Sequence, residues 1–212
     1  PIEPNIIPVK SSAGRTAMSR RPAVFLDRDG TIIHDVHHLC DARQVRLISG
    51  AGQAIRRMRD AGYVAVIVTN QSVLGRGMLD MAGLELIHAE MNRQLEGEGG
   101  RIDAIYFCPV APAAEGERTA IEHPDRKPGP GMLLRAAQEL NLDLGRSWMI
   151  GDMISDMLAG RNAGCMGTIL LTSGHGRTQD QTHAAIDHVA DDLMGAAEII
   201  VAGRRIRGSV AT

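Results

Sequence analysis

The sequence predicts an α/β fold, a three-layer sandwich in which helices cover both faces of a mostly parallel sheet. Short apolar runs of strand length alternate along the chain with amphipathic segments of helical period, which is the pattern of βαβ units. Polar residues follow directly on several apolar runs, as expected where parallel strands end at one edge of a sheet. With 212 residues, 44% of them hydrophobic, the chain is long enough to bury one sizeable core.

The expected strands are apolar runs too short for helices and bounded by polar residues, glycine or proline. The first run ends at Asp27, and Gly30 then lets the chain turn away. Because strands that alternate with helices form parallel sheets with both faces covered, these strands are expected to be buried. In chain order they are residues 23–26, 64–68, 102–107, 148–150 and 168–171.

The expected helices carry apolar residues three or four positions apart. Gly62 ends the first helix and Gly164 closes the fourth, since glycine favours helix C-termini. Pro130 stands at the start of the third, where proline is tolerated. In chain order the helices run from 51 to Gly62 and over residues of about 80–94, 130–140, 154–163 and 191–202.

One domain with extensions is the expected organisation, because no internal repeat and no second domain is evident. Residues 1–20, with three prolines and no signal-peptide layout, indicate a flexible N-terminal arm. Residues 21–205 are expected to form the domain and residues 206–212 a C-terminal tail. The polar stretch 108–126 is long for a loop in a compact domain, and such loops are often functional.

Composition excludes several classes of function. The net charge is −2 and aromatic residues make up 2%, so neither an electrostatic footprint nor a stacking platform for nucleic acid is expected. No apolar run approaches the ~18 residues of a membrane span. Three cysteines without a Cys-x-x-Cys pair fit a reducing compartment and predict a cytoplasmic protein. Without a strong extra apolar stripe, a monomer is expected.

The chemistry is expected at the carboxyl ends of the strands. Asp27, Thr69 and Asp152 each come directly after an apolar run. Asp27 and Asp29 are two residues apart, so in an extended segment both carboxylates point the same way. Such a pair in isolation is more often an exposed turn, but its place after a buried strand favours a site. Paired carboxylates hold a cation or share a proton, and oxygen ligands favour Mg²⁺.

Four motifs in order extend this interpretation. Residues 25–31, Phe-Leu-Asp-Arg-Asp-Gly-Thr, resemble the first motif of the haloacid dehalogenase (HAD) phosphatase superfamily. Residues 68–70 resemble the second motif, Lys127 before a proline the third, and residues 151–156 the fourth. The motifs span most of the chain, from about 21 to 171. The resemblance implies a Rossmann-like, HAD-like fold.

A narrower resemblance rests on residues 69–72, 75–77 and 126–132. These are similar to the D-glycero-D-manno-heptose 1,7-bisphosphate 7-phosphatases, with the histidinol-phosphate phosphatase domains as close relatives. Both families lack a large cap domain, and the interval between the first two motifs here leaves room for only one loop and one helix.

The resemblance assigns roles to the motif residues. Asp27 is the expected nucleophile, and Asp29 protonates the leaving sugar oxygen and then activates water. Thr69 and Lys127 hold the phosphoryl oxygens. Mg²⁺ is bound by Asp27, by the backbone carbonyl of Asp29 and by Asp152.

Further residues are expected around this centre. Asp156, one helical turn after Asp152, supports the metal or Lys127. Arg126 has a planar fork suited to a second phosphate or a pair of sugar hydroxyls. The full set of expected substrate-binding residues is Asp35, His38, Asn70, Gln71, Ser72, Arg126 and Met153.

The sequence departs from these relatives in one loop. They typically carry a zinc site of the pattern Cys-x-His … Cys-x-Cys between the second and third motifs. Here the candidate ligands are Cys108, His123 and Asp125, with a valine at the remaining position. Three mixed ligands would hold zinc only weakly, because structural sites usually have four ligands rich in cysteine. A zinc-free loop is therefore expected.

The sequence thus predicts a cytoplasmic, Mg²⁺-dependent phosphatase that acts on a small phosphorylated sugar through an aspartyl-phosphate. The narrower resemblance implies D-glycero-D-manno-heptose 1,7-bisphosphate, cleaved at C7, as the expected substrate. Two alternatives stay open: a histidinol-phosphate phosphatase, and a phosphate-binding module of the same fold without turnover.

Overall fold

A computed structural model describes residues 19–112 and 119–208 of the chain. Its centre is a six-stranded sheet in the order β3-β2-β1-β4-β5-β6, and every neighbouring pair of strands is parallel. The strands are β1 Ala23–Leu26, β2 Val64–Asn70, β3 Ala104–Cys108, β4 Trp148–Gly151, β5 Gly167–Leu171 and β6 His188–Ala190.

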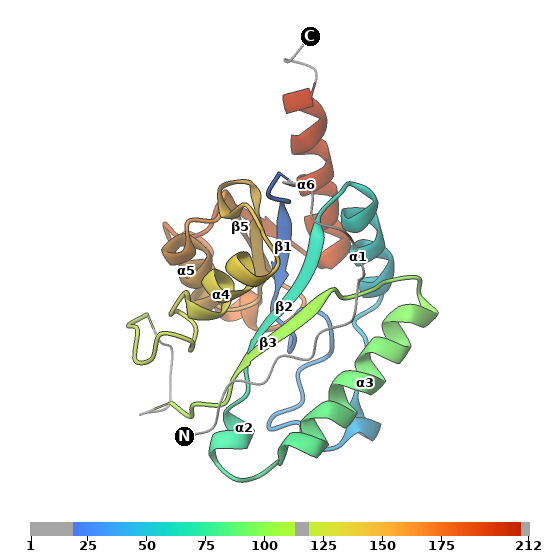
Figure 1. Cartoon of the computed structure of the whole chain (residues 1–212), viewed down its shortest axis with the longest axis vertical. Helices are drawn as coiled ribbons and strands as arrows, with labels where there is room; N and C mark the ends of the chain where they lie inside the picture. The colour runs from blue at the N-terminus through green and yellow to red at the C-terminus, as the bar shows by residue number, and fades with distance from the viewer. Residues whose placement is uncertain (1–18, 113–118, 209–212) are drawn as a thin grey trace.

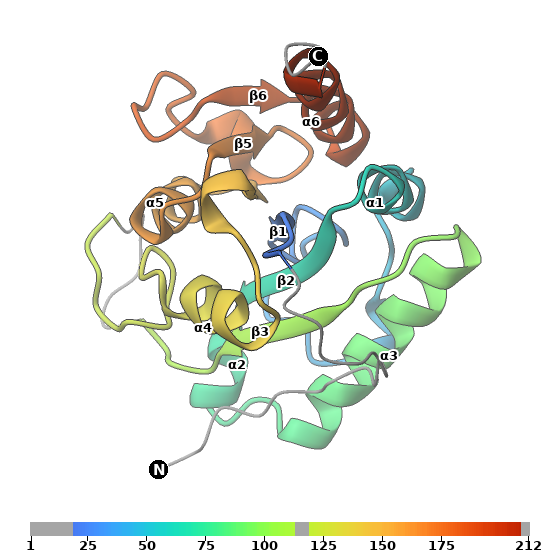
Figure 2. The same ribbon diagram turned by 45° about the horizontal axis from the view of Figure 1, so that its top comes forward.

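Helices cover both faces of this sheet, so the architecture is a three-layer α/β sandwich (Figure 1). In Figure 2, α1, α3 and α6 lie on one side of the strands and α4 and α5 on the other. The helices are α1 Ala51–Asp60, α2 Ser72–Gly75, α3 Met81–Gly97, α4 Gly131–Glu139, α5 Ile154–Ala163 and α6 Leu193–Gly208.

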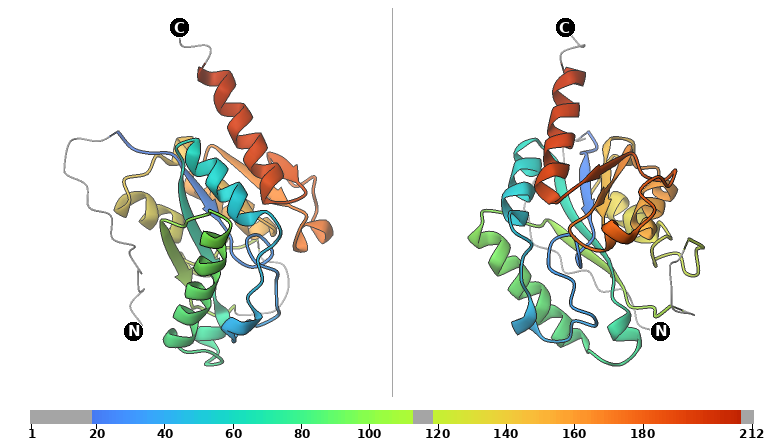
Figure 3. Two further views of the ribbon diagram at one scale, coloured as in Figure 1. Left: turned by 90° about the vertical axis from the view of Figure 1, so that its right-hand side faces the viewer. Right: turned by 180° about the vertical axis from the view of Figure 1, so that it is seen from behind.

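Alternate residues of the strands point to opposite faces of the sheet and contribute to two separate hydrophobic cores. On β1, Val24 and Leu26 pack with α1, α3 and α6, whereas Ala23 and Phe25 pack with α4 and α5. All four β1 side chains are fully buried. Helix α6 packs along α1, and its C-terminal half extends beyond the sheet (Figure 3). In the described part of the chain, none of the helices has the length and apolar character needed to cross a membrane.

The predicted fold class is confirmed, and the boundaries of most elements are correct to within a few residues. The sequence prediction missed β6, because a three-residue strand with two exposed residues carries no apolar run. It also missed the single turn of α2. The third strand begins at Ala104, two residues later than predicted. Helix α3 continues to Gly97 and α6 to Gly208, so the last helix enters the segment predicted as a tail.

Of the predicted N-terminal arm, residues 1–18 lie outside the described residues, as do residues 209–212 of the predicted tail and 113–118 of the long loop. The prediction of one domain over 21–205 stays a prediction.

Strand register brings the predicted motif residues to one edge of the sheet. Leu26 of β1 lies level with Ile67 of β2 and Ile150 of β4. Asp27 follows one residue after this level, and Thr69 and Asp152 follow two residues after it. Three central strands therefore deliver polar side chains to one place, at the carboxyl edge where ligands bind in open parallel sheets.

Candidate active site

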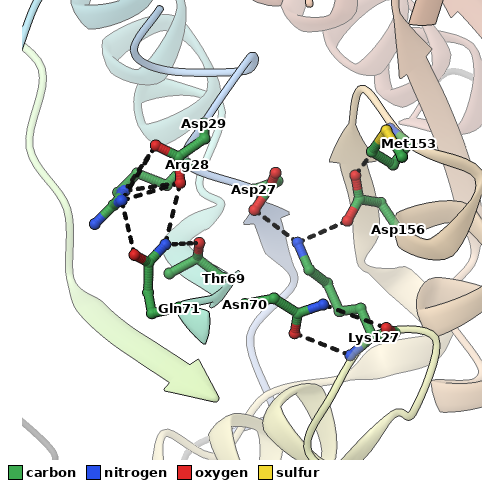
Figure 4. A network of polar contacts seen from close by, with 9 residues as sticks. All are labelled: Asp27, Arg28, Asp29, Thr69, Asn70, Gln71, Lys127, Met153 and Asp156. Carbon is green, nitrogen blue, oxygen red and sulfur yellow. Dashed lines mark hydrogen bonds and ion pairs between the residues drawn. The ribbon is translucent and has the colours of Figure 1, made fainter. Parts of the chain in front are cut away.

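Lys127 is the centre of a buried charge cluster. Its Nζ lies 2.6 Å from Asp27 Oδ1 and 2.6 Å from Asp156 Oδ1 (Figure 4). The side chains of all three residues are almost fully buried. Asp27 comes from the end of β1, Lys127 from the loop before α4, and Asp156 from the first turn of α5. One cation thus joins three segments that are distant in sequence.

Glycines leave room for the carboxylates of this cluster. A Cβ on Gly30 would lie 2.1 Å from Asp152 Oδ2, and one on Gly174 would lie 2.2 Å from the same atom. Gly30 also has φ +77°, which glycine adopts without strain. A Cβ on Gly151 would meet Asp156 Oδ2 at 2.2 Å. The chain therefore approaches these carboxylates more closely than any larger residue would allow.

Backbone amides fix two of the carboxylates. The amide of His175 donates to Asp152 Oδ2 at 2.7 Å. The amide of Met153 donates to Asp156 Oδ2 at 3.0 Å, which caps the start of α5. Asp152 and Asp156 are therefore oriented by the loops and helix that carry them, not by solvent.

Burial and mutual repulsion dominate the electrostatics of the cluster. Burial raises the pKa of Asp27 to about 7, with repulsion from Asp156 and Asp29 adding to it and the Lys127 ammonium opposing it. Burial, with repulsion from Asp27 and Asp156, raises the pKa of Asp152 to about 8. The pKa of Lys127 is raised because the attraction of Asp156 and Asp27 outweighs its own desolvation. One lysine does not balance three carboxylates, so a further cation would be stabilised here.

The carboxylates that surround Lys127 also fit a divalent cation. Among the described residues, one group of metal-ligating side chains stands out: Asp27, Asp152 and Asp156 each offer an oxygen, and these oxygens lie within 4.8 Å of one another. An all-oxygen set of carboxylates suits Mg²⁺. The side chain of Asp29 is not in this group. The sequence prediction assigned the backbone carbonyl of Asp29, and not its side chain, to the metal, so that assignment stays a prediction.

Asp29 belongs to a second network. Its Oδ2 accepts from Gln71 Nε2 at 3.1 Å and lies 3.0 Å from Arg28 Nη2. Gln71 Nε2 also lies 2.8 Å from Thr69 Oγ1. Figure 4 shows this network on one side and the Asp27–Lys127 pair on the other. Asp27 and Asp29 both line one cleft, but their carboxylates bond to different partners.

Asn70 connects β2 to the lysine. Its Oδ1 accepts from the backbone amide of Lys127 at 3.1 Å, and its Nδ2 donates to the carbonyl of the same residue at 3.3 Å. Asn70 lines the cleft as well, but these bonds make its first effect the placement of Lys127.

The cleft above the carboxylates has a volume of about 510 Å³. Most of the residues predicted from the sequence line it, whereas Gln71 is buried, lines an adjacent cavity and bonds to Arg28, Asp29 and Thr69. The predicted residues on its walls are Asp27, Asp29, Asp35, His38, Thr69, Asn70, Ser72, Arg126, Lys127, Asp152, Met153 and Asp156. The Arg126 guanidinium is anchored by donation from Nη1 to the carbonyl of Val110 at 2.8 Å.

The cleft wall also includes Arg76, Pro112, Ser155 and His175, which the sequence prediction did not name as substrate-binding or catalytic residues, and His37, which lies in the stretch 35–38 predicted to line the substrate mouth. His175 Nε2 lies 2.7 Å from Asp35 Oδ2, so the loop after β5 meets the loop after β1 at the mouth. A rule that every loop after a parallel strand faces the same edge would have found His175. Arg76 stands in the segment 75–77, one of the three segments that carry the narrower family resemblance.

The three candidate zinc ligands have other partners. Cys108 is buried at the end of β3, and burial raises its thiol pKa. His123 Nδ1 accepts from the amide of Asp125 at 3.1 Å, and Asp125 Oδ2 lies 3.2 Å from Arg135 Nη1. The expectation of a zinc-free loop stays a prediction.

Comparisons with known proteins agree with this geometry. A HAD-hydrolase-like family model matches residues 125–196. The D-glycero-beta-D-manno-heptose-1,7-bisphosphate 7-phosphatase of Rhodopseudomonas palustris is 43% identical over 150 residues, 70% of this chain and 82% of the relative. The D-glycero-D-manno-heptose-1,7-bisphosphate 7-phosphatase of Thermosynechococcus vestitus is 38% identical over 188 residues, 85% of this chain and 95% of that one.

A solved structure shares the fold of this chain. The D,D-heptose 1,7-bisphosphate phosphatase of B. bronchiseptica, complexed with magnesium and phosphate, superposes with a TM-score of 0.76. It is 33% identical in sequence, and the match covers 86% of this chain and 99% of that one. By sequence and by fold, the chain belongs to the family of D-glycero-D-manno-heptose 1,7-bisphosphate 7-phosphatases within the HAD hydrolases.

Proposed function

We propose that the protein hydrolyses the C7 phosphate ester of D-glycero-D-manno-heptose 1,7-bisphosphate, with Mg²⁺ as cofactor and through an aspartyl-phosphate on Asp27. The observation that carries the proposal is the group of Asp27, Asp152 and Asp156 around Lys127 at the floor of the cleft. Buried carboxylates with one buried lysine suit a dianionic phosphoryl group only when a second cation is bound. In phosphatases of this family, that second cation is a bound Mg²⁺.

Asp27 is the nucleophile. Lys127 holds Asp27 Oδ1, and Oδ2 is the atom assigned to attack phosphorus. In the first step a bond forms between Asp27 Oδ2 and phosphorus while the bond from phosphorus to the sugar oxygen breaks. Asp29 delivers a proton to that oxygen, so the sugar leaves as an alcohol. In the second step water attacks phosphorus, Asp29 takes the proton of the water, and the bond from Asp27 to phosphorus breaks.

Lys127 and the proposed Mg²⁺ would offset the negative charge of the reacting phosphoryl group. Asp27, the backbone carbonyl of Asp29 and Asp152 would hold Mg²⁺, with support from Asp156, and the bound cation would supply electrostatic stabilisation to the phosphoryl oxygens. Lys127 lies between Asp27 and Asp156 and also lines the cleft, where its ammonium can hold a phosphoryl oxygen, and Thr69 Oγ1 offers a hydroxyl donor. Asn70 sets the position of Lys127 through two hydrogen bonds to its backbone.

The mouth of the cleft is where the rest of the substrate binds. Arg76 and Arg126 place guanidinium groups on its wall, as a second phosphate requires. The Asp35–His175 pair lines the same cleft and provides acceptors and donors for sugar hydroxyls. A volume of about 510 Å³ is adequate for a seven-carbon sugar with two phosphates.

The test is phosphate release by purified protein with Mg²⁺ from both anomers of heptose 1,7-bisphosphate, fructose 1,6-bisphosphate and histidinol phosphate, with Asp27→Asn as the blank. Strong preference for one heptose anomer, lost in the blank, is the expected result. Preference for histidinol phosphate would change the assigned substrate but leave the assigned reaction, phosphate ester hydrolysis, in place. Comparable weak rates on all four would remove the heptose assignment.

We also propose that the enzyme works as a cytoplasmic monomer, because its cysteines are free in the described part of the chain and every residue assigned to the reaction belongs to this chain. Size-exclusion chromatography with light scattering tests the monomer directly. A dimer at micromolar concentration would contradict it.

A further inference from the structure

The buried residue His88, outside the substrate cleft, is connected through Arg28 to Asp29, the proposed general acid. His88 lies on α3, is 2% exposed, and lines a separate cavity of about 350 Å³ between α3 and β3. It is absent from the wall of the substrate cleft. Its Nε2 nevertheless lies 3.3 Å from Nη1 of Arg28, the residue between the two catalytic aspartates. Helix α3 is thereby linked to the first motif through a side chain that no step of the proposed reaction uses.

The direction of this hydrogen bond is fixed by chemistry. Arg28 has only donors, so His88 Nε2 must be the acceptor, and the ring proton must lie on Nδ1. His88 is therefore neutral in this arrangement. Burial and the neighbouring guanidinium lower its pKa to about 3, in agreement with that assignment.

Arg28 in turn holds the Asp29 carboxylate. Arg28 is 1% exposed, and all three guanidinium nitrogens form hydrogen bonds. Nη1 reaches His88, Nη2 donates to Gln71 Oε1 at 2.9 Å, and Nε and Nη2 donate to the Asp29 oxygens at 3.1 to 3.3 Å. Two of these partners, on α3 and just after β2, orient the arginine, and the arginine orients Asp29.

We propose that His88 is a positioning residue for the phosphatase reaction: it braces Arg28, and Arg28 with Gln71 sets the position from which Asp29 serves as general acid and base. The inference rests on the proposed function of Asp29. Without the acceptor on α3, the guanidinium can turn toward the cavity beside His88. Asp29 then loses its defined position, and proton transfer to the leaving oxygen suffers.

The leaving group separates this role from a merely structural one. A sugar alkoxide needs a proton as it departs, whereas p-nitrophenolate departs readily without one. Loss of the position of Asp29 should therefore slow the first phosphoryl transfer from a sugar phosphate far more than that from p-nitrophenyl phosphate. A general loss of folded enzyme would reduce both rates equally.

The variants are His88→Leu, which removes the acceptor, and His88→Gln, which keeps an acceptor at similar reach. Leu84→Ala is the matched control, because Leu84 is a buried residue one turn earlier on α3 that packs in the core. Each is followed by rapid-quench single turnover with heptose 1,7-bisphosphate and p-nitrophenyl phosphate, and by thermal unfolding.

His88→Leu is expected to slow transfer from the sugar phosphate about 10- to 100-fold, part of the ~10²–10⁴-fold that a general acid contributes. Transfer from the aryl phosphate and KM should change less than about 3-fold, because neither needs the acid. His88→Gln should restore most of the sugar rate. Leu84→Ala should lower Tm and leave the ratio of the two rates unchanged.

An unchanged ratio in His88→Leu would overturn the proposal, as would a His88→Gln variant as slow as His88→Leu. Failure of the proposed substrate gives a different result: the wild type would then release no phosphate from heptose 1,7-bisphosphate but would still act on fructose 1,6-bisphosphate. The sugar arm would be repeated with that ester, and the ratio would decide the role of His88 independently.

Discussion

Replacement of Lys127 by methionine tests the charge balance of the site. Methionine keeps the length and apolar stem of lysine but removes the ammonium that lies 2.6 Å from both Asp27 and Asp156. These side chains are 3%, 11% and 1% exposed, so water cannot replace the lost partner without rearrangement. Breaking a buried ion pair by removal of one partner costs about 3–5 kcal/mol of unfolding free energy.

The size of the thermal effect follows from chain length. For a domain of 150–250 residues, about 1 kcal/mol corresponds to roughly 2–4 °C in Tm, so Lys127→Met in EDTA should unfold about 6–20 °C earlier than the wild type. Saturating Mg²⁺ should recover part of this loss, because the cation neutralises the same carboxylates. Removal of one group that stabilises the transition state should also lower kcat by about 10²–10³-fold.

The assay is differential scanning fluorimetry with and without Mg²⁺, paired with phosphate-release kinetics. Arg93→Met is the matched control, since Arg93 is an exposed cation paired with Glu90; its Tm and kcat should stay at the wild-type values. A Lys127→Met protein that melts with the wild type in EDTA and keeps its kcat would refute this account of the cluster.

The remaining predictions concern pH, backbone and metal. The pKa values of Asp27 and Asp152 are raised to about 7 and about 8, so between about pH 6.5 and pH 8, above the range in which the lowered pKa of His88 acts in the opposite direction, the folded state binds more protons than the unfolded state. Tm in EDTA should therefore fall as pH rises through that window, and the gain from Mg²⁺ should grow; a flat Tm would contradict this. Gly30→Ala should lower kcat by about 10²-fold or more, because the added Cβ displaces Asp152. Gly77→Ala, with a similar positive φ but open space around it, should not lower kcat; equal kcat for the two variants would show that the close approach of Gly30 to Asp152 does not matter for the reaction. EDTA should abolish phosphate release and Mg²⁺ should restore it, while elemental analysis should find little zinc; stoichiometric zinc would mean that the loop over 108–125 does form a site.

The sequence predicted the sheet well because its strands are buried on both faces. The run Val64–Asn70 has six buried residues in succession, and such runs are visible without any alignment. β6 was missed for the opposite reason: two of its three residues are exposed, and it is held by pairing with β5. Its existence depends on a neighbour distant in sequence, which local pattern does not record.

The same distinction applies to the site. The order of the strand ends brought Asp27, Thr69 and Asp152 to one place, as the pattern of parallel strands requires. The direction of each side chain could not be predicted. Gln71 was predicted to bind substrate, and that stays a prediction; in the structure it is buried and its amide bonds to Arg28 and Asp29. These partners come from different segments, so only the packed structure pairs them.

The most direct test of the central claim is phosphorus NMR of the wild-type reaction with D-glycero-D-manno-heptose 1,7-bisphosphate and Mg²⁺. The C7 phosphate resonance should disappear as the signal of inorganic phosphate grows, while the C1 phosphate resonance persists, and Asp27→Asn should show no change. Loss of the C1 phosphate instead, or release of phosphate by Asp27→Asn at the wild-type rate, would contradict it.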